Sequence, residues 1–276
     1  MLKDFYVLNN DHFEKHFAES EYLVCEKKVV GFVDILGFKN IIGETSLSKL
    51  VNKFNQFLKI EDYINSYKHV NTKLCIRYIF SDSIVFYSQD NTLASFLKLL
   101  YYSWNLYRIA LGSGFLLRGA IVYDEFYAKE NLLLGKALTK AAISEKKQDW
   151  SGIVIDKSIY KIYPYFDNFI NYLNLDKFYP YYNIPFKDND FKKMRCINWS
   201  INTIFEYSLK ELLTKNINKD CESKINNTLK FAKKMINMYT NENVKINFGN
   251  ETLRYNKMYI SKKNPSKNSI KNIDNY

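Results

Sequence analysis

The stretch VVGFVDILGFKNII, residues 29–42, carries one acidic residue, Asp34, inside an apolar run that has the composition of a buried β-strand. An unpaired carboxylate in the low-dielectric interior of a protein costs several kcal/mol unless something nearby offsets its charge. Two interpretations account for Asp34 at this stage. It is either a core aspartate that caps the turn after the strand, or a ligand of a metal ion.

The composition is that of a globular protein with a large core. The 276 residues are 47% hydrophobic and 17% aromatic, which suits one large domain or one domain with a C-terminal extension. No run approaches the roughly 18–20 apolar residues of a membrane span, and the charged N-terminal segment does not resemble a signal peptide. The four cysteines are scattered without a CxxC pair, as in reduced thiols. We therefore expect a cytoplasmic protein without a membrane partner.

The formal net charge of +11 is the second bulk property that bears on function. A basic protein can bind nucleic acid, an anionic membrane or a phosphorylated small substrate. The lysines are spread along the chain, and many lie in the Lys/Asn-rich C-terminal third rather than in a cluster. This distribution is typical of a Lys/Asn/Ile-rich proteome, so we expect no stable nucleic-acid partner.

Hydrophobic periodicity predicts alternating strands and helices over the first 160 residues. The expected strands are residues 28–34, 74–80, 83–88, 115–123 and 152–156, with a hairpin at 125–135. The expected helices are residues 45–67, 91–111 and 136–148, and the glycines at 112–114 end the second one. The core of this order is β-α-β-β-α-β, so we predict an α+β fold with a ferredoxin-like βαββαβ unit.

The remaining sequence has a weaker pattern. YYNIPFK and MRCINWSI are expected to be edge strands, and residues 223–242 a helix. The polar tail has the composition of a disordered segment. The expected domains are a lead-in at 1–27, a core domain at 28–160, a C-terminal mixed α+β extension at 161–260 and the disordered tail at 261–276.

A second acid, Asp82, lies in FSDSIVFY, residues 80–87, at the tight turn between two expected strands. The first strand of a βαββαβ unit lies beside this hairpin, so Asp34 and Asp82 are expected to meet at one end of the sheet. Two close carboxylates raise each other's pKa unless a cation lies between them, and magnesium or manganese suits that position. Backbone N–H groups of the ILGF turn that follows Asp34 can point toward phosphates. The alternative is that Asp82 is only a turn residue.

Four motifs in order resemble the class III nucleotide cyclases. FVDILGF and FSDSIVFY resemble their two metal-aspartate motifs, LLRGAIVYDEFY their Arg-x-Gly strand, and GKALTKAAISEK their dimer-site helix. The match covers about residues 28–160. The chain is most similar to the pyrimidine cyclases of the Pycsar antiphage systems, which make cyclic UMP or cyclic CMP. The block from GKAL to GIVID, together with YNIPFK and INW, fits that subgroup better than adenylate cyclases.

The resemblance implies a metal site and a phosphate contact. Asp34 and Asp82 would hold two Mn²⁺ or Mg²⁺ ions, and the main-chain carbonyl of Ile35 would contribute to one of them. Arg118 would bind phosphate oxygens through its fixed-charge guanidinium fork. The alternative for this arginine is a surface residue at the end of a strand.

The resemblance also implies which residues contact the substrate. The segment from Phe32 through Gly37 to Phe38 would line the triphosphate. Tyr78 takes the position of the base-selecting residue of purine cyclases, and Leu132 that of their second base contact.

The sequence departs from the purine cyclases at three positions. Ser81 stands where many members have glycine, Thr139 where they have the ribose-orienting asparagine, and Ile143 where they have the transition-state arginine. Another cation must then take the place of the transition-state arginine, and the candidates are Arg118, Lys136 and Lys140. These two lysines are four residues apart on one helix face, so a solvated face is the alternative for both.

The activity that the resemblance implies is conversion of UTP to 3′,5′-cyclic UMP and pyrophosphate, as a second messenger for antiphage defence. The protein would be a homodimer, and a separate effector would respond to the product rather than bind the enzyme. A cytidylate cyclase acting on CTP and a catalytically degenerate nucleotide-binding sensor are the alternatives. A polymerase-like palm shares the sheet and the acids, but the chain has no recognisable fingers or thumb.

Overall fold

The computed structural model describes residues 26–60, 75–130, 132–200, 206–217, 221–239, 244–248 and 251–255. The expected tail at 261–276, and all but two residues of the expected lead-in, lie outside these described residues. Within them, no helix combines the length and the apolar character needed to cross a membrane.

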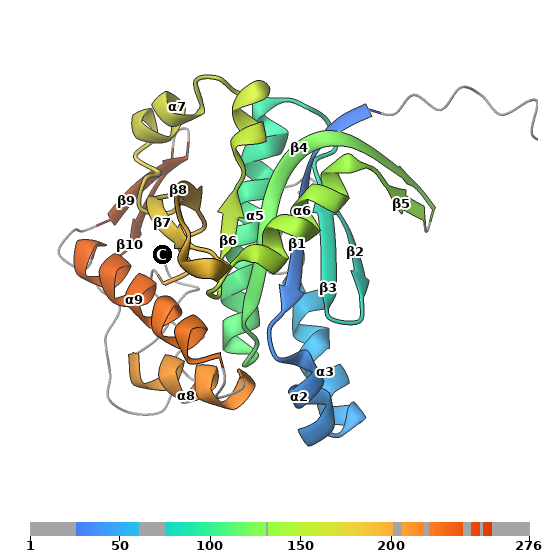
Figure 1. The fold of residues 1–276 in the computed structure, drawn as a ribbon. Coiled ribbons are helices and arrows are strands. Elements are labelled where there is room, and N and C mark those ends of the chain that lie inside the picture. The colour runs from blue at the N-terminus through green and yellow to red at the C-terminus, as the bar shows by residue number, and fades with distance from the viewer. Residues whose placement is uncertain are drawn as a thin grey trace, which may run out of the picture.

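A mixed sheet with the order β2-β3-β1-β4-β6-β8-β7 is the centre of the fold, and β5 pairs with β4 (Figure 1). A separate hairpin joins β9 to β10. The strands are β1 (Glu26–Ile35), β2 (Ile76–Phe80), β3 (Ser83–Tyr87), β4 (Leu117–Lys129), β5 (Leu132–Leu134), β6 (Ile153–Ile155), β7 (Tyr181–Pro185), β8 (Phe191–Cys196), β9 (Val244–Phe248) and β10 (Glu251–Tyr255).

Helices lie on both faces of this sheet, with α6 in front of it and α5 behind it in Figure 1. The α-helices are α2 (Phe38–Glu44), α3 (Leu47–Leu58), α5 (Leu93–Gly112), α6 (Lys136–Lys147), α7 (Phe166–Tyr172), α8 (Glu206–Asn216) and α9 (Glu222–Tyr239). Two short 3₁₀ helices are η1 (Lys157–Lys161) and η2 (Lys187–Asn189).

The predicted ferredoxin-like unit is confirmed. Strands β2, β3, β1 and β4 are neighbours in that order, and each adjacent pair is antiparallel. This is the arrangement that two interleaved right-handed βαβ crossovers produce. The α+β fold class predicted from the sequence is therefore confirmed as well.

The C-terminal end of α5 follows the predicted signal, and its N-terminal end has a cap that the sequence analysis does not name. The Thr92 hydroxyl caps the first turn by accepting a hydrogen bond from the Ser95 amide at 3.2 Å. The helix ends at Gly112, and Gly114 adopts a φ of 81° in the turn that follows. The GSG segment is thus a helix end and turn, as the sequence analysis predicts.

Several boundaries differ from the sequence prediction. The strand expected at 115–123 is longer and forms β4, whose last three residues pair with β5 in the predicted hairpin. The short helix α2 directly after β1 is not predicted. The strands expected in the C-terminal extension are present as β7 and β8. Only β7 is an edge strand as expected, because β8 pairs with both β6 and β7, and the extension therefore continues the sheet of the core domain.

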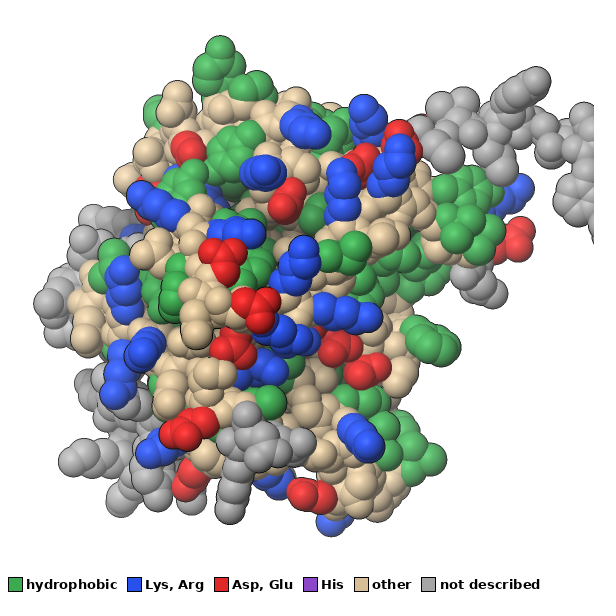
Figure 2. All heavy atoms as spheres, in the orientation of Figure 1, with side chains coloured by type: hydrophobic (Ala, Val, Ile, Leu, Met, Phe, Trp, Pro, Cys, Tyr) green, Lys and Arg blue, Asp and Glu red, His purple; other side chains and the backbone are tan. Residues whose placement is uncertain are grey.

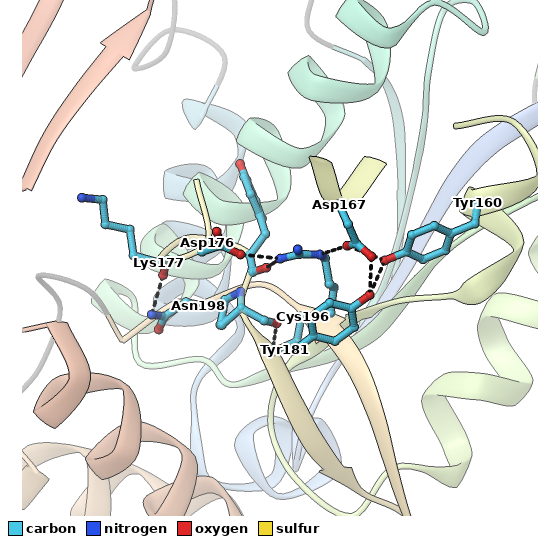
Figure 3. A network of polar contacts seen from close by, with 10 residues as sticks. Tyr160, Asp167, Asp176, Lys177, Tyr181, Cys196 and Asn198 are labelled. Carbon is cyan, nitrogen blue, oxygen red and sulfur yellow. Dashed lines mark hydrogen bonds and ion pairs between the residues drawn. The ribbon is translucent and has the colours of Figure 1, made fainter. Parts of the chain in front are cut away.

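A buried arginine fixes the C-terminal part of this sheet. Arg195 of β8 is 3% exposed, and its guanidinium forms ion pairs with Asp167 and with Asp176. The hydroxyls of Tyr160 and Tyr181 donate to the two oxygens of Asp167 at 2.9 and 2.7 Å (Figure 3). These donors hold the pKa of Asp167 below its usual value, although burial acts in the opposite direction. The network ties η1, α7 and the β7–β8 hairpin together.

Replacing Arg195 should therefore be costly. Arg195→Met removes the positive charge shared by Asp167 and Asp176 and the donor to the Tyr179 carbonyl, and it should lower the free energy of unfolding by about 2–3 kcal/mol. Lys192→Met is the control, since its ion pair with Asp190 joins two side chains that are more than half exposed. Urea denaturation measures both. Equal midpoints for the two variants would contradict a structural role for Arg195.

Candidate functional site

The sheet register decides which face Asp34 occupies. Asp34 lies directly opposite Ser83 on β3 and Arg118 on β4, so the three side chains point to the same face. The neighbouring positions point to the other face, where Phe86 contacts Tyr102 of α5 with ring centroids 5.2 Å apart. The face of Asp34 is therefore the one that α6 covers (Figure 1).

Asp82 lies beside Asp34, as the fold prediction requires. The Ile35 amide donates a hydrogen bond to the Asp82 carbonyl at 3.0 Å, and the Ser83 hydroxyl donates to Asp34 Oδ1 at 3.4 Å. Burial and then the charge of Asp82 raise the pKa of Asp34 to about 6, and Glu145 adds to this rise. Two carboxylates are thus held close enough to disfavour simultaneous ionisation.

The turn that carries Asp82 is strained at the residue before it. Ser81 has a φ of 55°, in the left-handed region that favours glycine, whereas the φ of Asp82 is not positive. A positive φ at only the first of two central hairpin residues is the type II′ pattern, which normally has glycine there. Serine therefore stands at a position where the local backbone favours the glycine found in many cyclases, and strain of this kind is frequent at functional sites.

The turn after Asp34 offers fewer amides than the sequence analysis expects. The amides of Ile35 and Leu36 donate to the carbonyls of Asp82 and Leu116, so the expectation that they face phosphates is wrong. Gly37, with a φ of 72°, precedes the first residue of α2. A Cβ atom on Gly37 would lie 1.6 Å from the Asn216 carbonyl oxygen, which means that this glycine is required for close packing against α8.

The two phenylalanines of this segment lie in different environments. Phe38 is 8% exposed and packs edge-on against Phe54 of α3, so its side chain belongs to the core and does not line a ligand site. Phe32 is half-buried, two residues before Asp34 on the same face of the sheet. Of the two, only Phe32 presents its side chain on the face of the acids.

Arg118 is neither a surface residue nor a free phosphate-binding fork. It is 8% exposed, which contradicts the surface alternative. Its Nε and Nη2 atoms bond Glu145 of α6, and Nη1 donates to the Gln148 carbonyl at 3.1 Å. The sequence analysis missed Glu145 and Gln148, because a glutamate and a glutamine in an amphipathic helix carry no local signal of a buried partner.

Tyr78 and Leu132 converge on the β4–β5 turn. Tyr78 of β2 lies opposite Val85 of β3, and Val85 lies opposite Phe32 of β1. Because Phe32 is on the same face of the sheet as Asp34, Tyr78 is on that face as well. Its hydroxyl donates to the Glu130 carbonyl at 2.9 Å, at the turn before Leu132, whose side chain is 50% exposed. The ring of Tyr78 stacks on Tyr87 with 6.4 Å between centroids. The two expected base contacts thus lie near one another.

The remaining expected substrate contacts lie in the first turns of α6. Lys136 pairs with Glu125 at 2.9 Å, and Lys140 pairs with Asp124. Both lysines are at least half exposed, which agrees with the solvated-face alternative. The Thr139 hydroxyl donates to the carbonyl one turn earlier. Nine residues separate Lys136 from the Glu145 end of the helix, or about 13 Å along its axis, so this group lies away from Asp34 within one chain.

The acids fit a divalent cation by their chemistry. Carboxylate oxygens are the ligands that magnesium and manganese prefer, and one or two carboxylates completed by substrate phosphates form the usual magnesium site in enzymes that act on nucleotides. The described part of the chain holds no group of three or more His, Cys, Asp or Glu side chains arranged for a metal. Asp34 and Asp82 would therefore need ligands from the substrate or the backbone.

Comparisons with known proteins identify similar solved structures only. No protein-family model and no curated protein matches the sequence. The catalytic core of a rhodopsin-guanylyl cyclase with converted specificity, in complex with ATPαS, is 13% identical over 62% of this chain and 94% of that one, with a TM-score of 0.43. A bacterial light-regulated adenylyl cyclase is 11% identical over 76% of this chain and 56% of that one, with a TM-score of 0.40. Similarities this low do not define an activity.

The raised pKa of Asp34 predicts an unusual pH dependence of stability. Because the folded pKa of about 6 lies above the ordinary value of 3.8, the charged form destabilises the metal-free protein above pH 6. This penalty fades as the pH falls through 6 and is absent below about pH 4. Asp34→Asn should thus raise the free energy of unfolding at pH 7.5 by about 1–2 kcal/mol, a value reduced for the partial exposure of the carboxylate.

Urea denaturation in a chelating buffer at pH 7.5 and pH 4 measures this effect. Asp90→Asn is a matched control, because hydrogen bonds from neighbouring side chains lower the pKa of Asp90 instead of raising it. A gain for Asp34→Asn that is the same at both pH values would contradict the electrostatic account.

Proposed function

We propose that this protein is a pyrimidine nucleotide cyclase that converts UTP to 3′,5′-cyclic UMP and pyrophosphate. The observation that carries the proposal is the proximity of Asp34 and Asp82 on the α6 face of a ferredoxin-like sheet. Burial and mutual repulsion make this pair unfavourable without a cation, and the motifs around it resemble those of class III cyclases. An enzyme that neutralises a triphosphate through metal ions explains why both acids are present.

The metal ions would be bound by Asp34, Asp82 and the carbonyl of Ile35. Two Mg²⁺ or Mn²⁺ ions at such a site neutralise a triphosphate and favour ionisation of an attacking hydroxyl. The protein supplies the carboxylates in a fixed register, since β1 is paired on both sides. Arg118, held by Glu145 and Gln148 on the neighbouring strand, partly opposes the rise in the pKa of Asp34 that burial and Asp82 cause, and it keeps a positive charge on this face of the sheet.

A homodimer with shared sites accounts for the residues that lie far from the acids. Lys136, Thr139 and Lys140 are on the exposed side of α6, away from Asp34 of the same chain. Exposed apolar side chains accompany them: Leu132, Leu134 and Ile143 are each about half exposed. In the proposed dimer the acids of one subunit and the 132–143 region of the other form each site. An apolar surface of this kind at a rim of polar residues favours association.

The hydroxyl of Tyr78 favours a second candidate substrate. Its proton is donated to the Glu130 carbonyl, which leaves the phenol oxygen as a hydrogen-bond acceptor. An acceptor matches the exocyclic amino group of cytosine, whereas O4 of uracil needs a donor. CTP and cyclic CMP are therefore the second candidate pair. In either case a one-ring base can pack against the phenol where a two-ring base would need its space.

A catalytically degenerate sensor is the remaining alternative. Thr139 and Ile143, in place of the asparagine and arginine of purine cyclases, favour it. The presence of both acids speaks against it, because a binding module has little use for two catalytic metals. As an enzyme, the protein would act in the cytoplasm, in keeping with the free thiols of Cys196 and Cys221. Its product would be the antiphage messenger that a separate effector detects.

Incubation with each of the four nucleoside triphosphates and Mn²⁺, followed by chromatography, tests the activity. We expect a cyclic product from UTP or CTP, and none from Asp34→Ala or Asp82→Ala, because either change removes half of the acidic pair. Asp90→Ala, which alters a surface turn before α5, should retain activity and is the matched control. Substantial product from either active-site variant would contradict the two-metal proposal.

Tyr78→Ala tests base selection. Opening the space beside the base should weaken discrimination against ATP and GTP by about ten- to a hundredfold, while turnover of the pyrimidine substrate falls less. Tyr78→Phe keeps the ring and removes only the acceptor oxygen, so it should reduce preference between CTP and UTP without admitting purines. Competition assays with all four triphosphates measure both ratios. Unchanged selectivity in Tyr78→Ala would remove Tyr78 from the base site.

A further inference from the structure

The cations expected to contact substrate phosphates are already paired in this structure. Arg118 forms an ion pair with Glu145, Lys136 with Glu125, and Lys140 with Asp124. Lys224, in the first turn of α9, differs from them: none of the described carboxylates lies within ion-pair distance of its ammonium group. This lysine belongs to the C-terminal extension, outside the segment that resembles a cyclase.

The docking of α9 places Lys224 beside Arg118. The Ser151 amide donates to the Thr228 hydroxyl at 2.9 Å, and the Ser151 hydroxyl donates to the Leu117 carbonyl at 2.9 Å. Thr228 is fully buried, so this contact fixes the face of α9 that meets the sheet. Lys224 lies one helical turn before Thr228 on that face, and its side chain is half-buried. Lys224 is thus next to Arg118, the residue that follows Leu117.

The turn at Gln148 and Asp149 brings a third cation to the same place. Arg118 donates to the Gln148 carbonyl at 3.1 Å, and Asn227 of α9 donates to the Asp149 carbonyl at 3.0 Å. On the other side, a β-bridge joins Gln148 to Phe186. Lys187 follows Phe186 directly, at the start of η2. Residues of β4, η2 and α9 therefore converge on one turn after α6.

The backbone of η2 forms a tight turn directly after Lys187. Asp188 and Asn189, which follow Lys187, have φ values of 66° and 56°. Aspartate and asparagine are the non-glycine residues that adopt this left-handed conformation most readily. The sequence of the loop therefore favours the turn that follows Lys187.

Electrostatics around Lys224 are unfavourable without a counter-ion. Burial first, and then the positive charges of Arg118 and Lys187, lower the pKa of Lys224, while Cys221 and Asp149 act in the opposite direction. Asp149 Oδ2 accepts from Asn227 at 3.2 Å rather than from the lysine. In Figure 2, Lys and Arg side chains alternate with acidic side chains on this face between α6 and α9. A bound anion would remove the penalty of a half-buried, unpaired ammonium group.

We propose that Lys187 and Lys224 form a polyphosphate-binding site, to which Arg118 adds its positive charge while it stays bonded to Glu145, and that the site takes the pyrophosphate end of the nucleoside triphosphate. The choice of substrate rests on the proposed function, because Arg118 is the direct strand partner of Asp34 and so lies about 5 Å from it between Cα atoms. In cyclisation, O3′ bonds to the α-phosphorus, the bond from that phosphorus to the bridging oxygen breaks, and the 3′ proton leaves to solvent. The charge that builds on pyrophosphate then faces these cations, which gives the C-terminal extension a role in the reaction.

Calorimetric titration of the full chain with inorganic pyrophosphate, in a chelating buffer without metal, tests the site independently of activity. We expect binding by the wild type, and an affinity lower by about tenfold in Lys224→Gln and lower again in Lys187→Gln/Lys224→Gln. Lys224→Arg keeps the charge and should retain most of the affinity. Lys230→Gln, on an exposed position of the same helix, is the matched control and should bind as the wild type does.

The KM for the nucleoside triphosphate is the second measurement, and it should rise in Lys224→Gln but not in Lys230→Gln. Equal pyrophosphate affinities of these two variants would overturn the site, whatever the activity. Weaker pyrophosphate binding with an unchanged KM would overturn its assignment to the substrate. If no triphosphate is cyclised while pyrophosphate binding still depends on Lys224, the proposed function fails and the polyphosphate site stands.

Discussion

The close approach of two carboxylates at the end of β1 is the constraint on which the functional account depends. It follows from the register: Asp34 faces Ser83 across the β1–β3 pair, and the Ile35 amide bonds the Asp82 carbonyl. A one-residue slip of either strand would turn Asp34 to the opposite face, against α5. The apolar alternation of three neighbouring strands therefore fixes an electrostatically costly pair, and a divalent cation is the simplest means of removing that cost.

Local signals in the sequence were sufficient for the central fold. Period-two strands, the glycine-containing end of α5 and the tight turn at Asp82 predict the βαββαβ order, and the order predicts that Asp34 and Asp82 meet. Interactions between distant segments could not be predicted in this way. In the sequence, Glu145 has the pattern of a solvated helix residue, and only the packing of α6 over Arg118 shows that it is buried. The sequence interpreted Gly37 as part of a triphosphate-binding segment and could not predict its contact with Asn216, 179 positions later.

The C-terminal extension completes the domain rather than following it. Strands β7 and β8 continue the sheet, and the Arg195 network holds their hairpin to η1 and α7. Helix α8 packs on Gly37 at the end of the turn after Asp34, and α9 packs on the segment beside Arg118. In the proposed function, the face of the sheet that carries Asp34 thus has two sources of charge: acids from the sheet, and cations contributed largely by segments that are distant in sequence.

Direct titration of manganese is the measurement closest to the central claim. Electron paramagnetic resonance of Mn²⁺ with the full chain and a non-hydrolysable pyrimidine triphosphate analogue counts bound ions without requiring turnover. The account predicts two ions per chain in the wild type and the loss of at least one in Asp34→Asn or Asp82→Asn. A wild type that binds no manganese in the presence of the analogue, or variants that bind it as tightly as the wild type, would contradict the claim that these carboxylates form a metal site.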